Sequence, residues 1–186
     1  SGSMDNFQVI AFLVAAVAAG APLLFGTLGE ILTGEVNPSA KMVDTYVYDL
    51  TQTPTWNNFG SMFYDNMDEF AVDGVLPSFV NYVEGIYVGY RYFDTFGVPV
   101  SYPFGYGQSY TTFNYSSLKV FMGDTDYSIS CTITNNGPVA GKEVVQLYIS
   151  APGKSMDKPA KELRGFAKTQ LLQPGESREI IFKVKD

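Results

Sequence analysis

The side chains best suited to chemistry gather between residues 51 and 73, where rings and amides stand together. Trp56, Asn57 and Asn58 are followed closely by Phe63 and Tyr64. An exposed ring can stack on the apolar face of a sugar while neighbouring amides bond its hydroxyl groups. The stretch has no clean period, so we predict a long ordered loop, which in a compact domain is usually functional or an interface. Trp56, Asn57 and Tyr64 are the candidate substrate-binding residues, and packing of this loop as an interdomain interface is the alternative.

The carboxylates form short clusters but match no catalytic motif. Asp65 stands near Asp68 and Glu69, and Asp124 stands near Asp126. Because exposed acids are the norm in loops, we interpret both clusters as solvated charge. The chain has no histidine at all, which excludes a histidine-based triad and the usual zinc ligand. We therefore predict no catalytic residue, no metal site and no cofactor for this chain.

Composition limits the class of protein and its partners. With 46% hydrophobic and 17% charged residues, the chain of 186 residues can form a folded core. The net charge of −7 argues against nucleic acid and against an anionic membrane surface as partners. The single cysteine, Cys131, excludes an intrachain disulfide and favours a cytoplasmic over a secreted protein. The 15% of aromatic residues is typical of sheet-rich structure.

The first 33 residues divide into two parts. Residues 1–4 have the look of an expression scar, and residues 5–33 form an apolar segment of uncertain origin. We predict a buried strand over residues 9–17, a Gly/Pro turn, and a helix from about Leu23 to Leu32 that ends at Gly34. The alternatives are a membrane or interfacial helix through residues 7–28, or a foreign junction near residues 26–33. Exposed apolar surface here would drive self-association.

Beyond residue 33 the pattern changes twice. Residues 34–115 contain long loops, with a strand predicted over residues 82–93 and a Gly/Pro-rich loop over residues 96–107. Residues 116–186 are all-β, with strict alternation over residues 127–134 and further strands near residues 145–149 and 180–184. We expect residues 135–141 to close a hairpin and residues 173–176 to form a type II turn. About five strands are apparent where such sandwiches have about seven, so the sandwich is predicted to be incomplete.

Four stretches in order resemble the C-terminal half of family 3 glycoside hydrolases of the β-glucosidase/β-xylosidase type. Together they cover roughly residues 29–186, and the departures from the family pattern are Ala40 and Gln108. The matching stretches are LTGEVNPSAK (32–41), YVEGIYVGYRYFD (82–94), YPFGYGQSYTTF (102–113) and TNNGPVAGKEVVQLY (134–148), the last continuing through 158–168 and 172–176.

The resemblance implies an α+β chain: the remnant of an α/β sandwich domain followed by an antiparallel, incomplete fibronectin-III-like (immunoglobulin-like) β-sandwich. In this family the two catalytic carboxylates of the retaining mechanism lie in regions that this chain does not match. The motifs then have structural roles, including a buried charge pair between Glu84 and Arg91. The structural motif residues are Asn37, Pro38, Glu84, Gly85, Arg91, Gly105 and Gly107.

The expected function follows from that resemblance. The chain is predicted to be an inactive, bacterial-type C-terminal fragment that serves as a scaffold and interdomain packing module. Its main partner would be the catalytic barrel of the parent enzyme, and loop 51–73 would border the cleft for β-linked glucosides or xylosides. The alternative is a stand-alone carbohydrate-binding or interaction module, tethered to a membrane through the apolar N-terminal segment.

Overall fold

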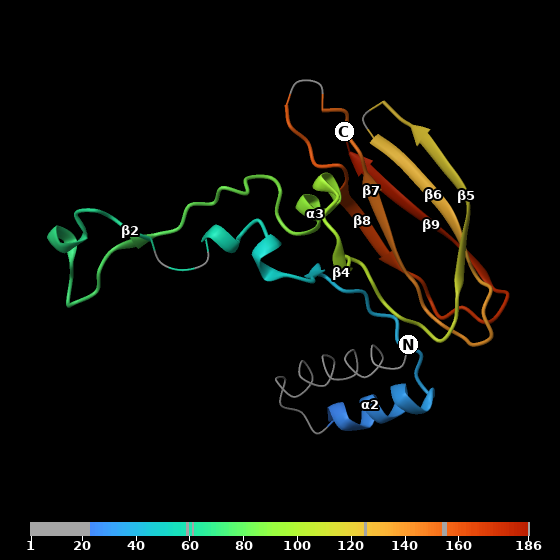
Figure 1. Ribbon diagram of the computed structural model, residues 1–186. Helices are drawn as coiled ribbons and strands as arrows, with labels where there is room; N and C mark the ends of the chain where they lie inside the picture. Colours follow the sequence, from blue (N-terminus) through green and yellow to red (C-terminus); the bar gives the residue numbers. More distant parts are fainter. Residues whose placement is uncertain (1–22, 59, 61, 125, 154–155, 186) are drawn as a thin grey trace. The chain divides into compact units, whose positions relative to one another are not determined.

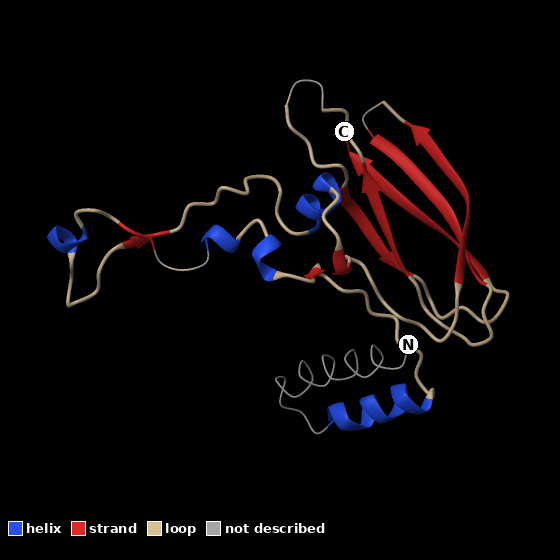
Figure 2. Cartoon of the chain, in the orientation of Figure 1, coloured by secondary structure: helices blue, strands red, loops and turns tan. Residues whose placement is uncertain are grey.

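The computed structural model describes residues 23–58, 60, 62–124, 126–153 and 156–185 (Figure 1). These residues are mostly β-structure with two α-helices, as Figure 2 shows. The predicted strand over residues 9–17 and most of the alternative membrane segment lie outside the described residues. Within the described part of the chain, no helix is long and apolar enough to cross a membrane.

The first described helix, α2, spans Leu23–Thr33 and ends where the sequence predicts. Gly34 adopts a φ of 82°, which costs glycine little and side chains much. In this conformation its N–H donates to the Ile31 carbonyl at 3.1 Å, and the Val36 N–H donates to Glu30 at 3.0 Å. The prediction of a helix stopped by Gly34 is therefore confirmed.

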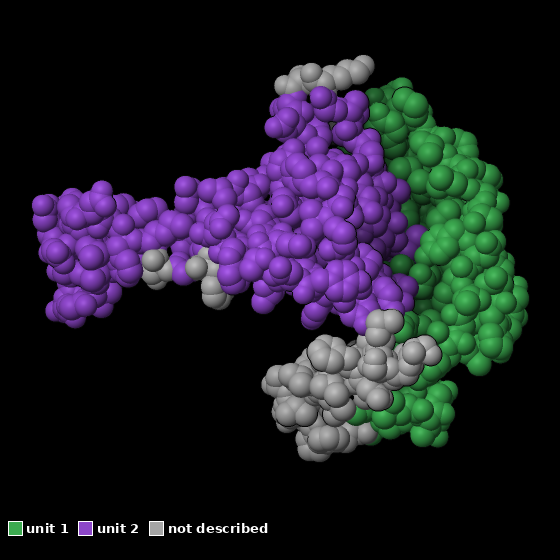
Figure 3. All heavy atoms as spheres, viewed as in Figure 1, with its two compact units in different colours: residues 1–40, 108–144, 168–186 green, residues 41–107, 145–167 purple. Residues whose placement is uncertain are grey.

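Two compact units share the chain, and each is built from separated stretches (Figure 3). Unit 1 contains residues 1–40, 108–144 and 168–186, and unit 2 contains residues 41–107 and 145–167. The sequence-based domain boundaries are not tested by this division and stay a prediction.

Unit 1 contains a three-stranded antiparallel sheet in the order β5-β6-β9. Its strands are β5 (Phe113–Met122), β6 (Asp126–Asn135) and β9 (Ser177–Lys185). The predicted alternation places Ile129 opposite Val120 on one side and Phe182 on the other. Directly opposed residues share a face of the sheet. Ile129 and Ile133 are buried on this face, so the strand prediction over residues 127–134 is confirmed.

Strand β7 (Val144–Ile149) pairs with β8 (Glu162–Lys168), not with β6. The predicted hairpin over residues 135–141 is therefore wrong. After Asn135 the chain meets Pro138, which has no N–H to continue a ladder, and it leaves the three-stranded sheet. The predicted type II turn does form: Gly175 has a φ of 81° and the Glu176 N–H donates to Gln173 at 2.9 Å. Among the described residues from Phe113 onward, the strands are β5 to β9.

The strand predicted over residues 82–93 is also wrong. Its second half begins helix α3, Tyr90–Phe96, and its first half is turn and loop. The β-branched and aromatic residues favour a strand, but Gly85 and Gly89 have φ angles of 54° and 57°, which extended strands do not adopt. The helix then ends at Gly97, which is left-handed and donates to the Phe93 carbonyl.

Short elements complete unit 2. Strand β1 (Tyr46–Val47) pairs with β4 (Val100–Tyr102), and β2 (Met62–Phe63) pairs with β3 (Ser78–Phe79), both antiparallel. Three 3₁₀ turns lie between them: η1 (Leu50–Gln52), η2 (Trp56–Asn58) and η3 (Met67–Phe70). No residue of these three turns is buried.

Candidate functional site

The predicted sugar-contact residues lie in separate elements of unit 2. Trp56 and Asn57 belong to η2, and Tyr64 directly follows β2. Trp56 is 45% exposed and Tyr64 is 49% exposed. Tyr64 packs against Phe79 with ring centroids 4.8 Å apart. The exposure of Trp56 permits a stacked ligand, but a shared sugar platform of Trp56, Asn57 and Tyr64 stays a prediction.

The predicted charge pair between Glu84 and Arg91 does not form. Glu84 accepts a hydrogen bond from the Asn58 amide at 2.9 Å, which ties η2 to the turn that precedes Gly85. Arg91 instead pairs with Glu162 of β8 at 3.2 Å. The turn at Gly85 and the start of α3 at Tyr90 separate the two residues, so the seven-residue spacing does not align them as it would on a continuous element.

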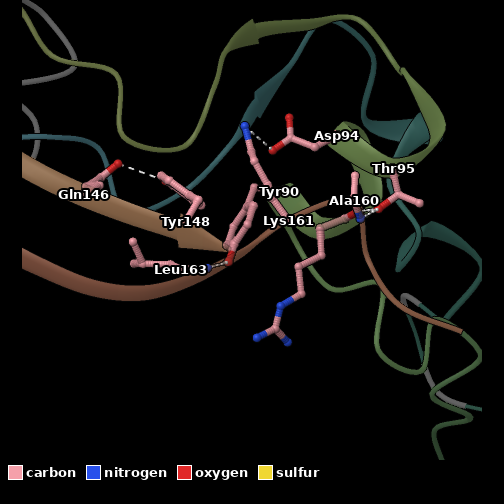
Figure 4. A network of polar contacts seen from close by, with 9 residues as sticks. Tyr90, Asp94, Thr95, Gln146, Tyr148, Ala160, Lys161 and Leu163 are labelled. Carbon is pink, nitrogen blue, oxygen red and sulfur yellow. Dashed lines mark hydrogen bonds and ion pairs between the residues drawn. The ribbon is translucent and has the colours of Figure 1, made fainter. Parts of the chain in front are cut away.

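Helix α3 is fastened to the stretch that leads into β8 by hydrogen bonds and an ion pair (Figure 4). The Tyr90 hydroxyl accepts from the Leu163 N–H at 2.8 Å, and the Thr95 hydroxyl accepts from the Ala160 N–H at 2.9 Å. Lys161 pairs with Asp94 at 3.1 Å. Tyr90 and Asp94 lie one turn apart and share a face of the helix, and Thr95 follows Asp94. Together the three side chains contact residues 160–163.

Aromatic rings pack beside this polar network. Tyr90 packs on Phe104 at a centroid distance of 4.8 Å and meets Tyr148 edge-on at 5.8 Å. The Lys161 ammonium lies 5.1 Å from the Tyr148 ring centroid, within cation–π range. Burial raises the pKa of the Tyr148 phenol, and the nearby Tyr90 and Asp94 raise it further. The Tyr148 hydroxyl is thus protonated at neutral pH and donates to Gln146 at 2.8 Å.

Gly105 lies close to Gln146, the hydrogen-bond partner of Tyr148. It has a φ of 81°, and a Cβ at this position would collide with the side-chain amide oxygen of Gln146. Its N–H donates to the Met42 carbonyl at 2.8 Å. The left-handed backbone explains why glycine occupies this position in the loop that also holds Gly107.

Two asparagines tie unit 1 together. Asn37 donates to the Ala140 carbonyl at 3.0 Å and accepts from the Ser109 hydroxyl and the Tyr110 N–H at 3.0 and 2.9 Å. The following Pro38 holds its predecessor extended. Asn135 is fully buried and bonds through both ends of its amide. Both side chains fix loops that lie outside the named strands.

Glu84, Asp94, Glu143 and Glu162 bind hydrogen-bond donors and cations. Glu143 accepts from the Tyr115 hydroxyl at 2.8 Å, and burial together with this bond raises the pKa of Tyr115 well above its usual range. Glu84, Asp94 and Glu162 have the partners described above. Within the part of the chain that the structure describes, no group of three or more metal-binding side chains comes together. The network holds backbone segments in position.

The turn at Asp73-Gly74 and helix α3 were not predicted, although the sequence carries a signal for each. Asp73-Gly74 forms a two-residue turn in which both φ angles are positive, at 50° and 78°. Val72 and Val75 exchange backbone hydrogen bonds of 3.2 and 2.9 Å across it. An Asp-Gly pair between valines is a strong signal for such a turn. The helical spacing of Tyr90 and Asp94 could likewise have indicated α3.

The C-terminal strands match a known domain family. Residues 143–186, which contain most of β7 and all of β8 and β9, match the family described as a fibronectin type III-like domain. The larger match defines the family: the chain belongs to the C-terminal region of family 3 (GH3) β-glucosidases, which carries this domain.

Curated relatives and solved structures agree. Thermostable beta-glucosidase B of Acetivibrio thermocellus is 39% identical over 167 residues, covering 88% of this chain and 20% of the relative. Beta-glucosidase A of Butyrivibrio fibrisolvens is 44% identical over 171 residues, covering 81% and 19%. The structure of beta-glucosidase 3B from Thermotoga neapolitana with glucose matches with a TM-score of 0.74 at 45% identity, covering 84% and 20%. The chain thus spans about a fifth of the length of these relatives.

Proposed function

We propose that this chain is a noncatalytic scaffold and interdomain packing module of a retaining β-glycosidase. The observation that carries the proposal is the set of partners of its carboxylates. A retaining glycosidase needs two carboxyl groups about 5 Å apart facing a sugar. Here Glu84, Glu143 and Glu162 bond an amide, a phenol and a guanidinium. These three carboxylates hold segments of the chain in place.

The direct test is hydrolysis of nitrophenyl β-glucoside and β-xyloside by the purified chain. We expect no release of nitrophenol above buffer. Release that persists through successive purification steps and follows the protein peak would overturn the proposal. Restored hydrolysis on mixing with a relative that lacks the matched region would support it.

A second candidate is a carbohydrate-binding module, and the exposed Trp56 favours it. In the intact enzyme the same ring would border the cleft for β-linked glucosides or xylosides, with Asn57 and Tyr64 near it. Titration calorimetry with cellobiose and xylobiose decides the question. Binding that is lost in Trp56→Ala would establish the module, whereas absence of heat at millimolar sugar would remove it.

We also propose a cytoplasmic location in a bacterial-type cell, supported by the lone Cys131. Fractionation of a producing cell tests it, because recovery in the secreted fraction would overturn it.

A further inference from the structure

The negative charge of this protein is concentrated in one stretch. Of its 19 acidic residues, seven lie in residues 42–90, and none of its 12 Lys and Arg residues do. This stretch, the 42–90 segment, therefore has a formal charge of −7, while the rest of the chain has 12 acids and 12 bases and is neutral. The seven acids are Asp44, Asp49, Asp65, Asp68, Glu69, Asp73 and Glu84.

The same segment leaves apolar side chains exposed. None of its described residues is buried. Monomeric proteins rarely expose so much apolar surface unless it binds something. Its exposed large hydrophobic residues are Val43, Tyr46, Tyr48, Leu50, Trp56, Phe63, Tyr64, Phe70, Val72, Val75, Leu76, Val80, Tyr82, Val83, Ile86 and Val88.

The 42–90 segment also has little internal structure to stabilise its own conformation. Strands β2 and β3 contribute two residue pairs, Met62 with Phe79 and Phe63 with Ser78. The tip adds one bridge between Val72 and Val75. A lone two-stranded hairpin is marginal in water even when it is longer than this. A defined hairpin with exposed valines and phenylalanines is therefore suited to lie against a second surface.

The negative charge of the 42–90 segment indicates what kind of surface it can bind. A second copy of the segment brings another seven acids against the first, and like charges facing each other oppose association. The remainder of this chain is neutral overall and supplies no excess of cations. A surface that is apolar at its centre and edged by Lys and Arg complements both properties of the segment.

We propose that the 42–90 segment is the docking surface of this module, and that it binds an apolar surface edged by Lys and Arg on the adjoining part of a family 3 β-glycosidase. The inference rests on the proposed scaffold function and names the surface and the chemistry of the partner. Phe63, Phe70 and Val75 supply apolar contact, and Asp65, Asp68 and Glu69 supply the acidic edge.

The test measures binding of the full chain to the beta-glucosidase B of Acetivibrio thermocellus lacking the region that this chain matches. Two charge variants are compared. One is the triple variant Asp65→Asn, Asp68→Asn, Glu69→Gln in the segment. The other is the matched triple variant Glu35→Gln, Asp124→Asn, Glu179→Gln, whose positions are exposed and lie outside the segment.

We expect the segment variant to raise Kd about tenfold at low salt, through slower association, and the matched variant to leave Kd within about twofold. Binding by the unsubstituted chain should weaken with added NaCl more steeply than binding by the segment variant. Binding with equal Kd for both variants would overturn the inference and leave the scaffold function standing. No binding to a folded partner would overturn both.

A second measurement does not depend on the folding of the truncated relative. The only tryptophan of the chain, Trp56, lies within the segment, so its fluorescence reports on occupancy there. The probes are an amphipathic Leu/Lys peptide, a Leu/Glu peptide and a Ser/Lys peptide. We expect a saturable change in Trp56 fluorescence with the Leu/Lys peptide and none with the other two peptides. An equal response to Leu/Glu, or dimerisation of the chain through this segment, would overturn the inference.

Discussion

Asn135 holds three loops with one buried amide. Its Oδ1 accepts from the Thr111 hydroxyl at 2.6 Å and from the Gly137 N–H at 3.1 Å. Its Nδ2 donates to the Val139 and Leu172 carbonyls at 2.8 and 2.9 Å. A Cβ at position 137 would collide with Thr111, so the glycine is part of the same arrangement. Every bonding group of the side chain is thereby satisfied, as a fully buried amide requires.

Asn135→Ala should therefore destabilise the fold by about 2–4 kcal/mol, because it leaves buried donors and acceptors without partners. Urea unfolding followed by circular dichroism measures the change. The neighbouring Asn136 is exposed, and Asn136→Ala is expected to change stability by less than about 0.5 kcal/mol. Equal losses for the two variants would contradict the assignment.

The reactivity of the Cys131 thiol depends on its burial and on the charge of Glu179. Partial burial raises the pKa of its thiol, and the charge of Glu179 raises it further. The thiolate is the reactive form, so alkylation by iodoacetamide at pH 8 should be slower than for a free thiol and should increase with pH. Glu179→Gln removes a negative charge, lowers the pKa of the thiol and should speed alkylation. Asp124→Asn is the control, and equal acceleration by both would refute the attribution.

At the scale of elements, helix α3 is held in place by hydrogen bonds between its side chains and the backbone of residues 160 and 163. The N–H groups of Leu163 and Ala160 are bonded by side chains of the helix. The ion pairs Arg91–Glu162 and Asp94–Lys161 lie beside them, and each is partly exposed. Exposed ion pairs add little stability, so the hydrogen bonds and the ring contacts are the main fastening.

Tyr90→Phe should keep the ring contacts but remove the acceptor of the Leu163 N–H, at a cost of about 1 kcal/mol. Amide exchange by NMR gives a local readout, and the Leu163 amide is expected to lose protection while amides of β6 keep it. Tyr82→Phe serves as the control because Tyr82 is 76% exposed. Unchanged exchange at Leu163 would show that the bond does not protect this amide.

At the scale of the whole molecule, burial and charge are unevenly distributed. Among the residues that the structure describes, the buried apolar ones are Phe93, Ile129, Ile133, Val145, Leu172 and Val184, and none of these lies in residues 42–90. Cleavage by proteases requires local opening, which is easiest where few contacts must break. Within the described residues, the 42–90 segment is thus expected to open readily.

Limited digestion with an endoprotease specific for glutamate should cut first after Glu69 and Glu84 and later after Glu143 and Glu162. Glu143 is buried and Glu162 belongs to a paired strand. Mass spectrometry of the early products identifies the sites. Trypsin is the matched control because the segment has no Lys or Arg, so it should leave residues 42–90 intact. Earliest cleavage at Glu143 would contradict this picture.

The sequence alone predicted the features that depend on neighbours along the chain. The helix ending at Gly34, the alternation of β6 and the turn at residues 173–176 follow from local period and from backbone angles that glycine permits. The lack of histidine and the charge imbalance were also fixed at this level. No arrangement in space can change them.

The tertiary structure determined which residues distant in the sequence contact each other. Arg91 meets Glu162 and not Glu84, Tyr90 begins a helix where strand-forming residues prevail, and β7 pairs with β8. Pairing across many residues depends on the path of the chain, which local patterns do not encode, and tertiary contacts override weak propensities. The proposed sugar contacts at Trp56, Asn57 and Tyr64 depend on such pairing, because one ring cannot orient a sugar without its neighbours.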